Sequence, residues 1–333
     1  MTTVFENAVP MKAIHIQPDK SLIWQDTAAP TPGPGEVAIR VHATAVNRAD
    51  LMQRAGLYPP PPGASSILGL ECAGEISALG SGVTSWQVGD RVCALLAGGG
   101  YAETVVCPAD HVLPAPAGFS WAEAAALPEV FATAWLNIFM EAGIRPGQKV
   151  LLHAGASGVG TAAIQLCKLQ GNPVFVTLGD SAKLDFCRQL GADAGHVRTE
   201  GDFEAAVKAW AGNDGVHAIL DPVGGAYLEQ NIRLLATDGS LVIIGLMGGR
   251  TASLDIGRLL VKRIRVIGST LRSRNNADKA TLIAQLREQV WPGFTDGRLK
   301  PIIHRIYPIQ QAEAAFIEVA SNATIGKVVL SVT

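Results

Sequence analysis

Residues 150–166, VLLHAGASGVGTAAIQL, join an apolar run to a glycine-rich turn and then to a helical pattern. The apolar run ends at His153, and the helix is predicted to start near Val159. This strand–turn–helix order is typical of a dinucleotide-binding site, whereas a glycine-rich turn alone would be weak evidence. The stretch therefore predicts the first strand and first helix of an α/β domain.

Within this turn, each glycine has a different predicted task. Gly155 permits the tight turn, and Gly160 lets the helix and the strand approach closely. Gly158 and the backbone around Ser157 and Val159 can bring a pyrophosphate to the helix N-terminus, where N–H groups are unpaired. Ser157 stands where the usual Gly-x-Gly-x-x-Gly pattern has its second glycine.

Four more apolar runs follow, each bounded by glycine or aspartate, at residues 172–179, 215–224, 239–248 and 263–270. They are apolar on both faces and alternate with segments of helical spacing, as expected for parallel strands covered by helices on both sides. Helices are predicted over 161–171 and 181–192, ending near Gly171 and Gly191. The pattern predicts a doubly wound parallel sheet.

The chain on either side of this region has a different pattern. Before about residue 130 it is β-like and loop-rich, with a half-buried strand at 36–46 and two strands joined by a turn in 75–95. Helices are predicted at 277–290 and 309–321, and 326–332 returns to strand-like alternation. We predict an irregular β domain, residues 1–133 and 273–333, interrupted by an α/β domain over 134–272.

Composition narrows the classes of function. The chain has 333 residues, is 48% hydrophobic and has a formal net charge of −2, so it has no basic patch that predicts binding to nucleic acid or membrane. We expect no signal peptide and no membrane span. The five cysteines are widely spaced without a Cys-x-x-Cys pair, which favours a reduced, cytoplasmic protein.

The end of the second strand bears on which dinucleotide binds. An NAD site usually has an acidic residue there, but this strand ends at Leu178 and Gly179. Lys183 and Arg198 follow, and each cation about 5 Å from a 2′-phosphate contributes roughly 3 kcal/mol per unit charge. We predict NADPH. The alternative is NADH, with Asp180 on the ribose and both cations solvated.

Several motifs together resemble the medium-chain dehydrogenase/reductase superfamily, in its zinc-free quinone oxidoreductase and zeta-crystallin branch. Within it the chain is similar to the tumour-suppressor-induced NADPH:quinone oxidoreductase type. The resemblance implies a GroES-like β domain, and a homodimer paired through edge strands near residues 263–269. The motifs lie at 47–63, 67–83, 88–103, 147–168, 221–225, 268–274 and 325–330.

The resemblance also implies that no zinc is bound. Zinc-dependent members have a histidine ligand where this chain has Leu70, and a cysteine ligand in the loop that here reads AVNRAD, 45–50. A catalytic zinc normally needs three protein ligands, and two of those expected are absent. The cysteines of the family's structural zinc lobe are also missing. We predict no zinc and no flavin.

The same resemblance implies the site residues. Asn47 and Tyr58 would donate hydrogen bonds to the substrate, Asp50 would orient its neighbours, and Thr133 would approach the nicotinamide. The alternatives are a surface aromatic for Tyr58 and a helix cap or first-turn charge for Asp50. Further residues implied to bind the cofactor are Gly245, Leu246, Met247, Ser269, Leu271, Arg272 and, on its phosphates, Lys327.

Without a Lewis acid, hydride transfer needs an acceptor that is already electron-poor. The leading hypothesis is therefore a zinc-independent NADPH:quinone oxidoreductase. The alternative enzyme is an NADPH-dependent reductase of 2-alkenals or enoyl groups. A different class is a non-catalytic NADPH-binding protein, crystallin-like or redox-sensing.

Overall fold

The computed structural model describes residues 10–332 and divides into two compact units. Unit 1 contains the chain up to Glu129 and again from Arg272 onward, and unit 2 contains Val130–Leu271. Each unit has its own sheet, so the irregular N-terminal pattern and the glycine-rich α/β pattern belong to different bodies. No helix in the described part of the chain is long and apolar enough to cross a membrane.

Unit 2 is built on a six-stranded parallel sheet in the order β10-β9-β8-β11-β12-β13. The strand order reverses between β8 and β11, which is the topological switch point of a doubly wound fold. The predicted parallel sheet is confirmed. Its strands are β8 (Val150–His153), β9 (Val174–Leu178), β10 (Ala194–Val197), β11 (Val216–Asp221), β12 (Leu235–Ile243) and β13 (Arg265–Gly268).

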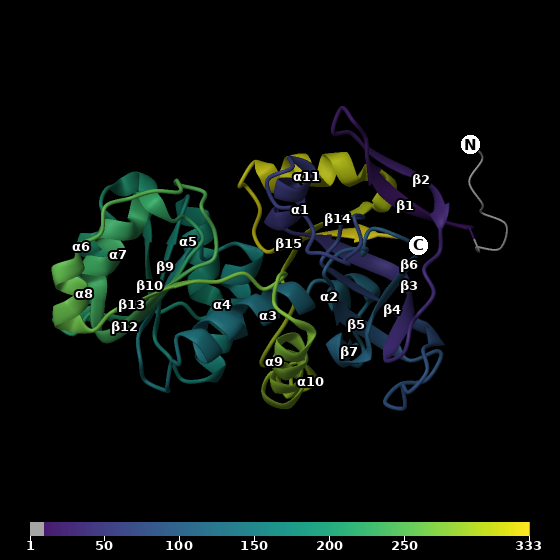
Figure 1. The fold of residues 1–333 in the computed structure, drawn as a ribbon. Coiled ribbons are helices and arrows are strands. Elements are labelled where there is room, and N and C mark those ends of the chain that lie inside the picture. Colours follow the sequence, from purple (N-terminus) through teal and green to yellow (C-terminus); the bar gives the residue numbers. More distant parts are fainter. Residues whose placement is uncertain (1–9, 333) are drawn as a thin grey trace. The chain divides into compact units, whose positions relative to one another are not determined.

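Helices cover both faces of this sheet (Figure 1). On one face α4 (Gly158–Leu169) packs beside α5 (Ser181–Leu190). On the other lie α6 (Phe203–Ala211), α7 (Leu228–Leu234) and α8 (Ile256–Lys262). Leu151, Phe175 and Ile219 of the strands are at most 2% exposed in the core beneath α6 and α7. Before the sheet, the chain forms α3 (Pro128–Trp135) and a π-helical turn over Leu136–Glu141.

Unit 1 is built around the long strand β3 (Glu36–Val46), which matches the predicted strand. β3 pairs with β15 and β4, and β6 also pairs with it. The sheet order is β14-β15-β3-β4-β5-β7, and β1 and β2 form a separate hairpin. The other strands are β1 (Pro10–Ile16), β2 (Leu22–Ala28), β4 (Glu71–Leu79), β5 (Arg91–Leu95), β6 (Thr104–Pro108), β7 (Val112–Pro114), β14 (Ile303–Pro308) and β15 (Lys327–Ser331).

In the part of unit 1 that the structure describes, five α-helices accompany the sheet. In Figure 1, α11 (Ala312–Ala320, yellow) lies close to α1 (Arg48–Arg54), although more than 250 residues separate them in sequence. The others are α2 (Trp121–Ala125), α9 (Asn276–Gln289) and α10 (Pro292–Thr295). Because β15 pairs with β3, the C-terminal segment returns to the sheet of the first segment, as its alternating pattern predicts.

A buried ion pair joins this returning strand to the rest of unit 1. Lys327 Nζ, in β15, lies 2.8 Å from Glu71 Oε1 at the start of β4. The ammonium also donates to the carbonyl of Val46 at 2.9 Å and to Asn47 Oδ1 at 2.6 Å. Lys327 is 4% exposed and Glu71 is fully buried. All three N–H groups therefore have acceptors, which offsets the cost of removing the charges from water.

Replacing Lys327 with methionine is expected to lower the free energy of unfolding by about 3–5 kcal/mol, because Glu71 keeps a buried charge without its counter-ion. Urea denaturation followed by circular dichroism measures the loss. Arg263→Met is the matched control, since Arg263 pairs with Asp238 and both side chains are 64% exposed. That surface pair contributes about 0–1 kcal/mol. Equal losses in the two variants would contradict the structural role of Lys327.

Candidate functional site

The glycine-rich turn between β8 and α4 is closely packed. A Cβ on Gly155 would lie 2.7 Å from Val176 Cβ, and one on Gly160 would lie 2.5 Å from the carbonyl oxygens of Ala154 and Gly155. Both distances are shorter than any normal contact, so these positions require glycine. Ala154 has φ of +55°, a conformation that L-residues seldom adopt and that brings the chain sharply round.

The start of α4 leaves backbone donors available. Ser157 caps the helix, and its Oγ accepts a hydrogen bond from the Gly160 N–H at 3.0 Å. No described residue accepts from the N–H groups of Gly158 or Val159. Helix N-terminal N–H groups of this kind bind phosphate oxygens. The turn therefore fits the pyrophosphate of a dinucleotide.

Arg198 lies beside the end of the second strand. A Cβ on Gly179 would be 3.9 Å from Arg198 Nη2, which places the guanidinium next to the loop after β9. Arg198 is exposed, and no acidic side chain of the described residues pairs with it. Asp180 instead caps α5 by accepting from the Lys183 N–H at 2.9 Å, with Lys183 Nζ 3.7 Å from its other oxygen.

The remaining predicted cofactor residues of unit 2 follow the next strands of the same sheet. Gly245 comes after β12, where a Cβ would lie 2.7 Å from the Pro222 carbonyl, and Leu246 and Met247 are about half exposed. Ser269 and Leu271 follow β13 and are buried. The loops after parallel strands gather at one sheet edge, so these residues share that edge with the glycine-rich turn. Thr133 lies in α3, half-buried.

A series of buried hydrogen bonds, which the sequence did not reveal, links the ends of three strands of this sheet. His153 Nδ1 is 2.8 Å from Thr177 Oγ1, and His153 Nε2 is 2.8 Å from Asn231 Oδ1. Asn231 Nδ2 donates to Asp221 Oδ2 at 3.0 Å. Burial lowers the pKa of His153, so the imidazole is neutral and links the ends of β8, β9 and β11. The motif DPVGG could have indicated Asp221 as a member.

In unit 1, Asp50 is buried and accepts hydrogen bonds from three separate segments. It is fully buried in the first turn of α1 and accepts hydrogen bonds from the Asn47 N–H at 2.8 Å, the Gly69 N–H at 3.2 Å and the Tyr101 hydroxyl at 3.1 Å. Burial raises the pKa of Asp50 to about 6, while these hydrogen bonds and Lys327 act in the opposite direction. Asp50 is mostly ionised at neutral pH and holds three segments together.

Asn47 and Lys327 are used within unit 1 in ways that differ from the roles implied for them. Asn47 Nδ2 donates to Glu71 Oε1 at 2.9 Å and to the Ala45 carbonyl at 3.3 Å. Its Oδ1 accepts from Lys327. Asn47 therefore has no free N–H group for a substrate oxygen, and Lys327 has none for a cofactor phosphate. Both therefore position Glu71.

Tyr58 forms a second group with Arg272. The Arg272 guanidinium carbon lies 5.6 Å from the Tyr58 ring centroid, and Arg272 Nε donates to the Ala97 carbonyl at 2.7 Å. Arg272 is 4% exposed and Tyr58 is half-buried. Burial, together with the neighbouring Glu129, raises the pKa of Tyr58. The phenol therefore stays protonated at neutral pH and can donate a hydrogen bond.

Glu129 was not predicted from the sequence, where it lies in the mainly apolar stretch LPEVFATAW. Its N–H donates to Glu71 Oε2 at 2.9 Å. Burial and the nearby Glu71 raise the pKa of Glu129 to about 8, with Lys327 opposing the shift. An acid that keeps its proton at neutral pH is a candidate for catalysis.

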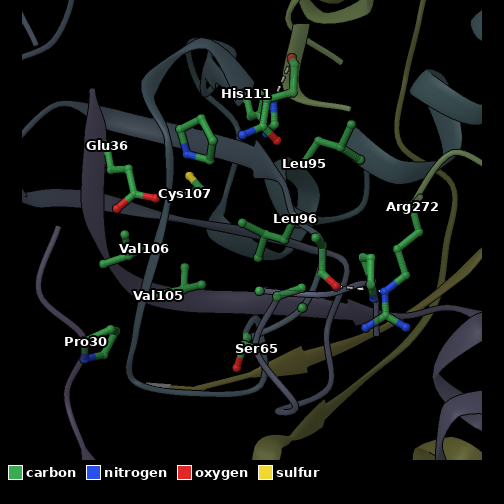
Figure 2. Close-up of a pocket in the computed structure, with 18 of the residues that line it drawn as sticks. Pro30, Glu36, Ser65, Leu95, Leu96, Val105, Val106, Cys107, His111 and Arg272 are labelled. Carbon is green, nitrogen blue, oxygen red and sulfur yellow. Dashed lines mark hydrogen bonds between the residues drawn. The ribbon is translucent and has the colours of Figure 1, made fainter. Parts of the chain in front are cut away.

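Unit 1 also contains a cavity of about 720 Å³, which Arg272 lines. Figure 2 shows Leu95, Leu96 and Val105 along it, with His111 and Arg272 on different sides. Of the site residues predicted from the sequence, only Arg272 lines it among the residues that the structure describes. We assign it no part in the reaction.

The residues around Glu71 do not fit a catalytic metal. Both carboxylate oxygens of Glu71 have donors: Lys327 and Asn47 on one, and the Glu129 N–H on the other. The ammonium would repel a cation, and Leu70 beside it is hydrocarbon. Across residues 10–332, no group of three histidine, cysteine, aspartate or glutamate side chains could hold a metal ion.

Comparison with known protein families gives one match in each half of the chain. A family model described as "Alcohol dehydrogenase GroES-like domain" matches residues 33–117, and one described as "Zinc-binding dehydrogenase" matches residues 158–287. The predicted fold class, a GroES-like domain with a Rossmann domain, is thereby confirmed.

Individual relatives cover nearly the whole chain. The crystal structure of the CurK enoyl reductase has a TM-score of 0.84 and 31% identity, covering 97% of this chain and 99% of that one. A mycobacterial protein, Rv1454c, complexed with NADPH has a TM-score of 0.85 and 28% identity, covering 96% and 99%. The quinone oxidoreductase of Rattus norvegicus is 28% identical over 96% of this chain and 97% of its own length. The chain also matches three Streptomyces polyketide synthases, of whose lengths it spans 5%, 8% and 13%.

Substituting Gly160 with alanine is expected to raise the dissociation constant for a nicotinamide dinucleotide such as NADPH at least about tenfold, because the new methyl group displaces the turn that presents the helix N-terminus. Quenching of protein fluorescence by NADPH measures the constant. Gly268→Ala is the control, since a Cβ there meets nothing within 4 Å. If the alanine variant at 160 bound as tightly as this control, the turn would not be the pyrophosphate site.

Proposed function

Because this chain belongs to the medium-chain dehydrogenase/reductase superfamily of oxidoreductases, we propose that it is a zinc-independent NADPH:quinone oxidoreductase. The observation that carries this proposal is the environment of Glu71. Its carboxylate is bound by an ammonium, an amide and a backbone N–H, so this part of unit 1 supplies no metal to activate an alcohol or a simple carbonyl. An acceptor that is already electron-poor, as a quinone is, needs no such activation by a metal.

Arg198 and the helix N-terminus support NADPH as the cofactor. The N–H groups of Gly158 and Val159 would bind the pyrophosphate, and Arg198 beside Gly179 would bind the 2′-phosphate. Asp180 is engaged in capping α5, which weakens the case for a ribose contact in an NADH enzyme. A solved relative that is 28% identical was crystallised with NADPH.

The nicotinamide, when bound, supplies a hydride. This chain's residues would orient the acceptor and stabilise the charge that develops on its oxygen. Tyr58 is the donor that we assign to that oxygen, because its phenol stays protonated and no described residue pairs with its hydroxyl. Asp50, Asn47 and the Lys327–Glu71 pair hold α1 and the start of β4 in place.

A second candidate is the reduction of a carbon–carbon double bond conjugated to a carbonyl. The similarity to the CurK enoyl reductase, at 31% identity over 97% of this chain, favours it. The same hydride and the same Tyr58 hydrogen bond would serve, with the carbonyl oxygen of the enone in place of the quinone oxygen. The two activities differ in which acceptor is turned over faster.

The test compares oxidation of NADPH and NADH by 1,4-benzoquinone and by a 2-alkenal, with and without a chelator. We expect chelator-insensitive turnover of the quinone that is faster with NADPH. Arg198→Ala should raise the KM for NADPH about tenfold, equivalent to about 1.4 kcal/mol, and leave that for NADH unchanged. Asp185→Asn on α5, also solvent-facing, is the control.

Each other outcome has a definite meaning. A preference for NADH would move the ribose contact to Asp180, and faster turnover of the alkenal would favour the enoyl reductase. No turnover of either acceptor would overturn the enzymatic proposal.

We also propose that the protein resides in the reducing cytoplasm, because its five cysteines are buried and free. We further propose that it is a homodimer. On α8, Ile256, Leu260 and Val261 are 74–79% exposed, next to β13, which is the last strand of its sheet. Leu260→Glu should convert the dimer to a monomer, measured by light scattering after size-exclusion chromatography. Ile317→Glu, 69% exposed in unit 1, is the control. A monomeric wild type would refute the dimer.

A further inference from the structure

The carboxyl group of Glu129 has no structural task that the hydrogen bonds of unit 1 explain. The backbone N–H of Glu129 is bonded to Glu71, but no described residue donates a hydrogen bond to its side chain. The residue is half-buried, and its carboxyl oxygens are not among the enclosed polar atoms without partners. The carboxyl group is therefore largely enclosed by protein but keeps some exposed surface, through which a small molecule can reach it.

Charged groups face this carboxyl from several elements. Glu71 of β4 and Asp50 of α1 disfavour its ionisation, whereas Lys327 of β15 and Lys279 of α9 favour it. Tyr58 and Arg272 also interact with it electrostatically. Burial is the largest effect, and three carboxyl groups share the nearby Lys327 ammonium. Glu129 consequently keeps its proton up to a pH of about 8, when its pKa is reached.

The proposed reaction requires such a proton. Addition of a hydride to a quinone brings two electrons and leaves a hydroquinone monoanion, which must gain one proton from an acid. The raised pKa of Tyr58 makes the phenol a hydrogen-bond donor and a poor proton source. Asp50 is mostly ionised at neutral pH, and its oxygens already accept three hydrogen bonds. Glu129 has both the proton and the access.

We propose that Glu129 is the general acid of the reaction and gives its proton to the acceptor oxygen that Tyr58 hydrogen-bonds. The O–H bond of the carboxylic acid breaks as the O–H bond of the hydroquinone forms, and the resulting carboxylate regains a proton from water. Lys327 and Lys279 stabilise the carboxylate meanwhile. This inference rests on the proposed quinone reductase function, and it adds a catalytic residue that neither the motifs nor the family resemblance indicated.

The pH dependence of kcat tests the proposal. In the wild type, the active form of Glu129 is protonated, so kcat for the quinone is level below pH 7 and falls as pH rises through about 8. In Glu129→Gln the side chain keeps nearly the same shape, but the amide cannot act as a proton donor in place of the carboxylic acid. It should lower kcat at pH 7 by about a hundredfold or more and should lose the fall near pH 8. Glu288→Gln is the matched control, because Glu288 is an exposed acid on α9. This variant should retain the wild-type kcat at pH 7 and the fall near pH 8.

An independent readout does not need turnover. Folded Glu129 keeps a proton that the unfolded chain releases near pH 4.5, so the folded state binds more protons between pH 4.5 and 8. The free energy of unfolding must then fall as pH rises through this range, relative to Glu129→Gln. Urea denaturation of both proteins at pH 5 and pH 8.5 measures the difference. Parallel pH dependence in the two proteins would overturn the protonated state.

The kinetic outcomes distinguish a failure of Glu129 as the general acid from a failure of the quinone reductase function. An active wild type whose fall near pH 8 survives in Glu129→Gln would overturn Glu129 as the acid and leave the quinone reductase standing. A wild type that turns over no quinone would overturn the proposed function and the acid role together.

Discussion

The buried ion pair between Lys327 and Glu71 is the interaction on which the arrangement of unit 1 depends. It joins β15, β4 and the residue that precedes α1, and the second oxygen of Glu71 holds the N–H of Glu129 at the start of α3. Two buried charges are tolerable because every donor of the ammonium and both oxygens of the carboxylate are hydrogen-bonded. The same arrangement places three carboxyl groups around one ammonium.

Because three carboxyl groups lie near one ammonium, the hydrogen bonds that each carboxyl receives determine whether it is ionised. Asp50 receives three hydrogen bonds, which stabilise its charge, and it serves as an anchor. Glu129 receives none from the described residues, so burial keeps it protonated. The two acids have the same chemistry in solution, and their different hydrogen bonds give them different roles in the protein. Unit 2 contributes a helix N-terminus and an arginine, which suit the phosphates of a dinucleotide.

Much of the fold could be predicted from the sequence, because it follows from local patterns. The strand at 36–46, the glycine-rich turn and the order of strands and helices after it all depend on residues close in sequence. The candidate site was less predictable. Lys327 was expected to contact a phosphate, but its acceptors at Val46, Asn47 and Glu71 lie more than 250 residues away in the chain. A sequence pattern does not show which distant groups saturate an ammonium.

By itself, the sequence determined the class of fold, the position of the dinucleotide turn and the absence of a histidine at Leu70. These features depend on residue type and short-range spacing. The tertiary structure alone decided that Asn47 and Lys327 support Glu71, that Arg198 lies beside Gly179, and that Glu129 holds a proton at neutral pH. Each of these depends on desolvation and on charges brought together by folding, and the free energy of a charge is set by such neighbours rather than by its place in the chain.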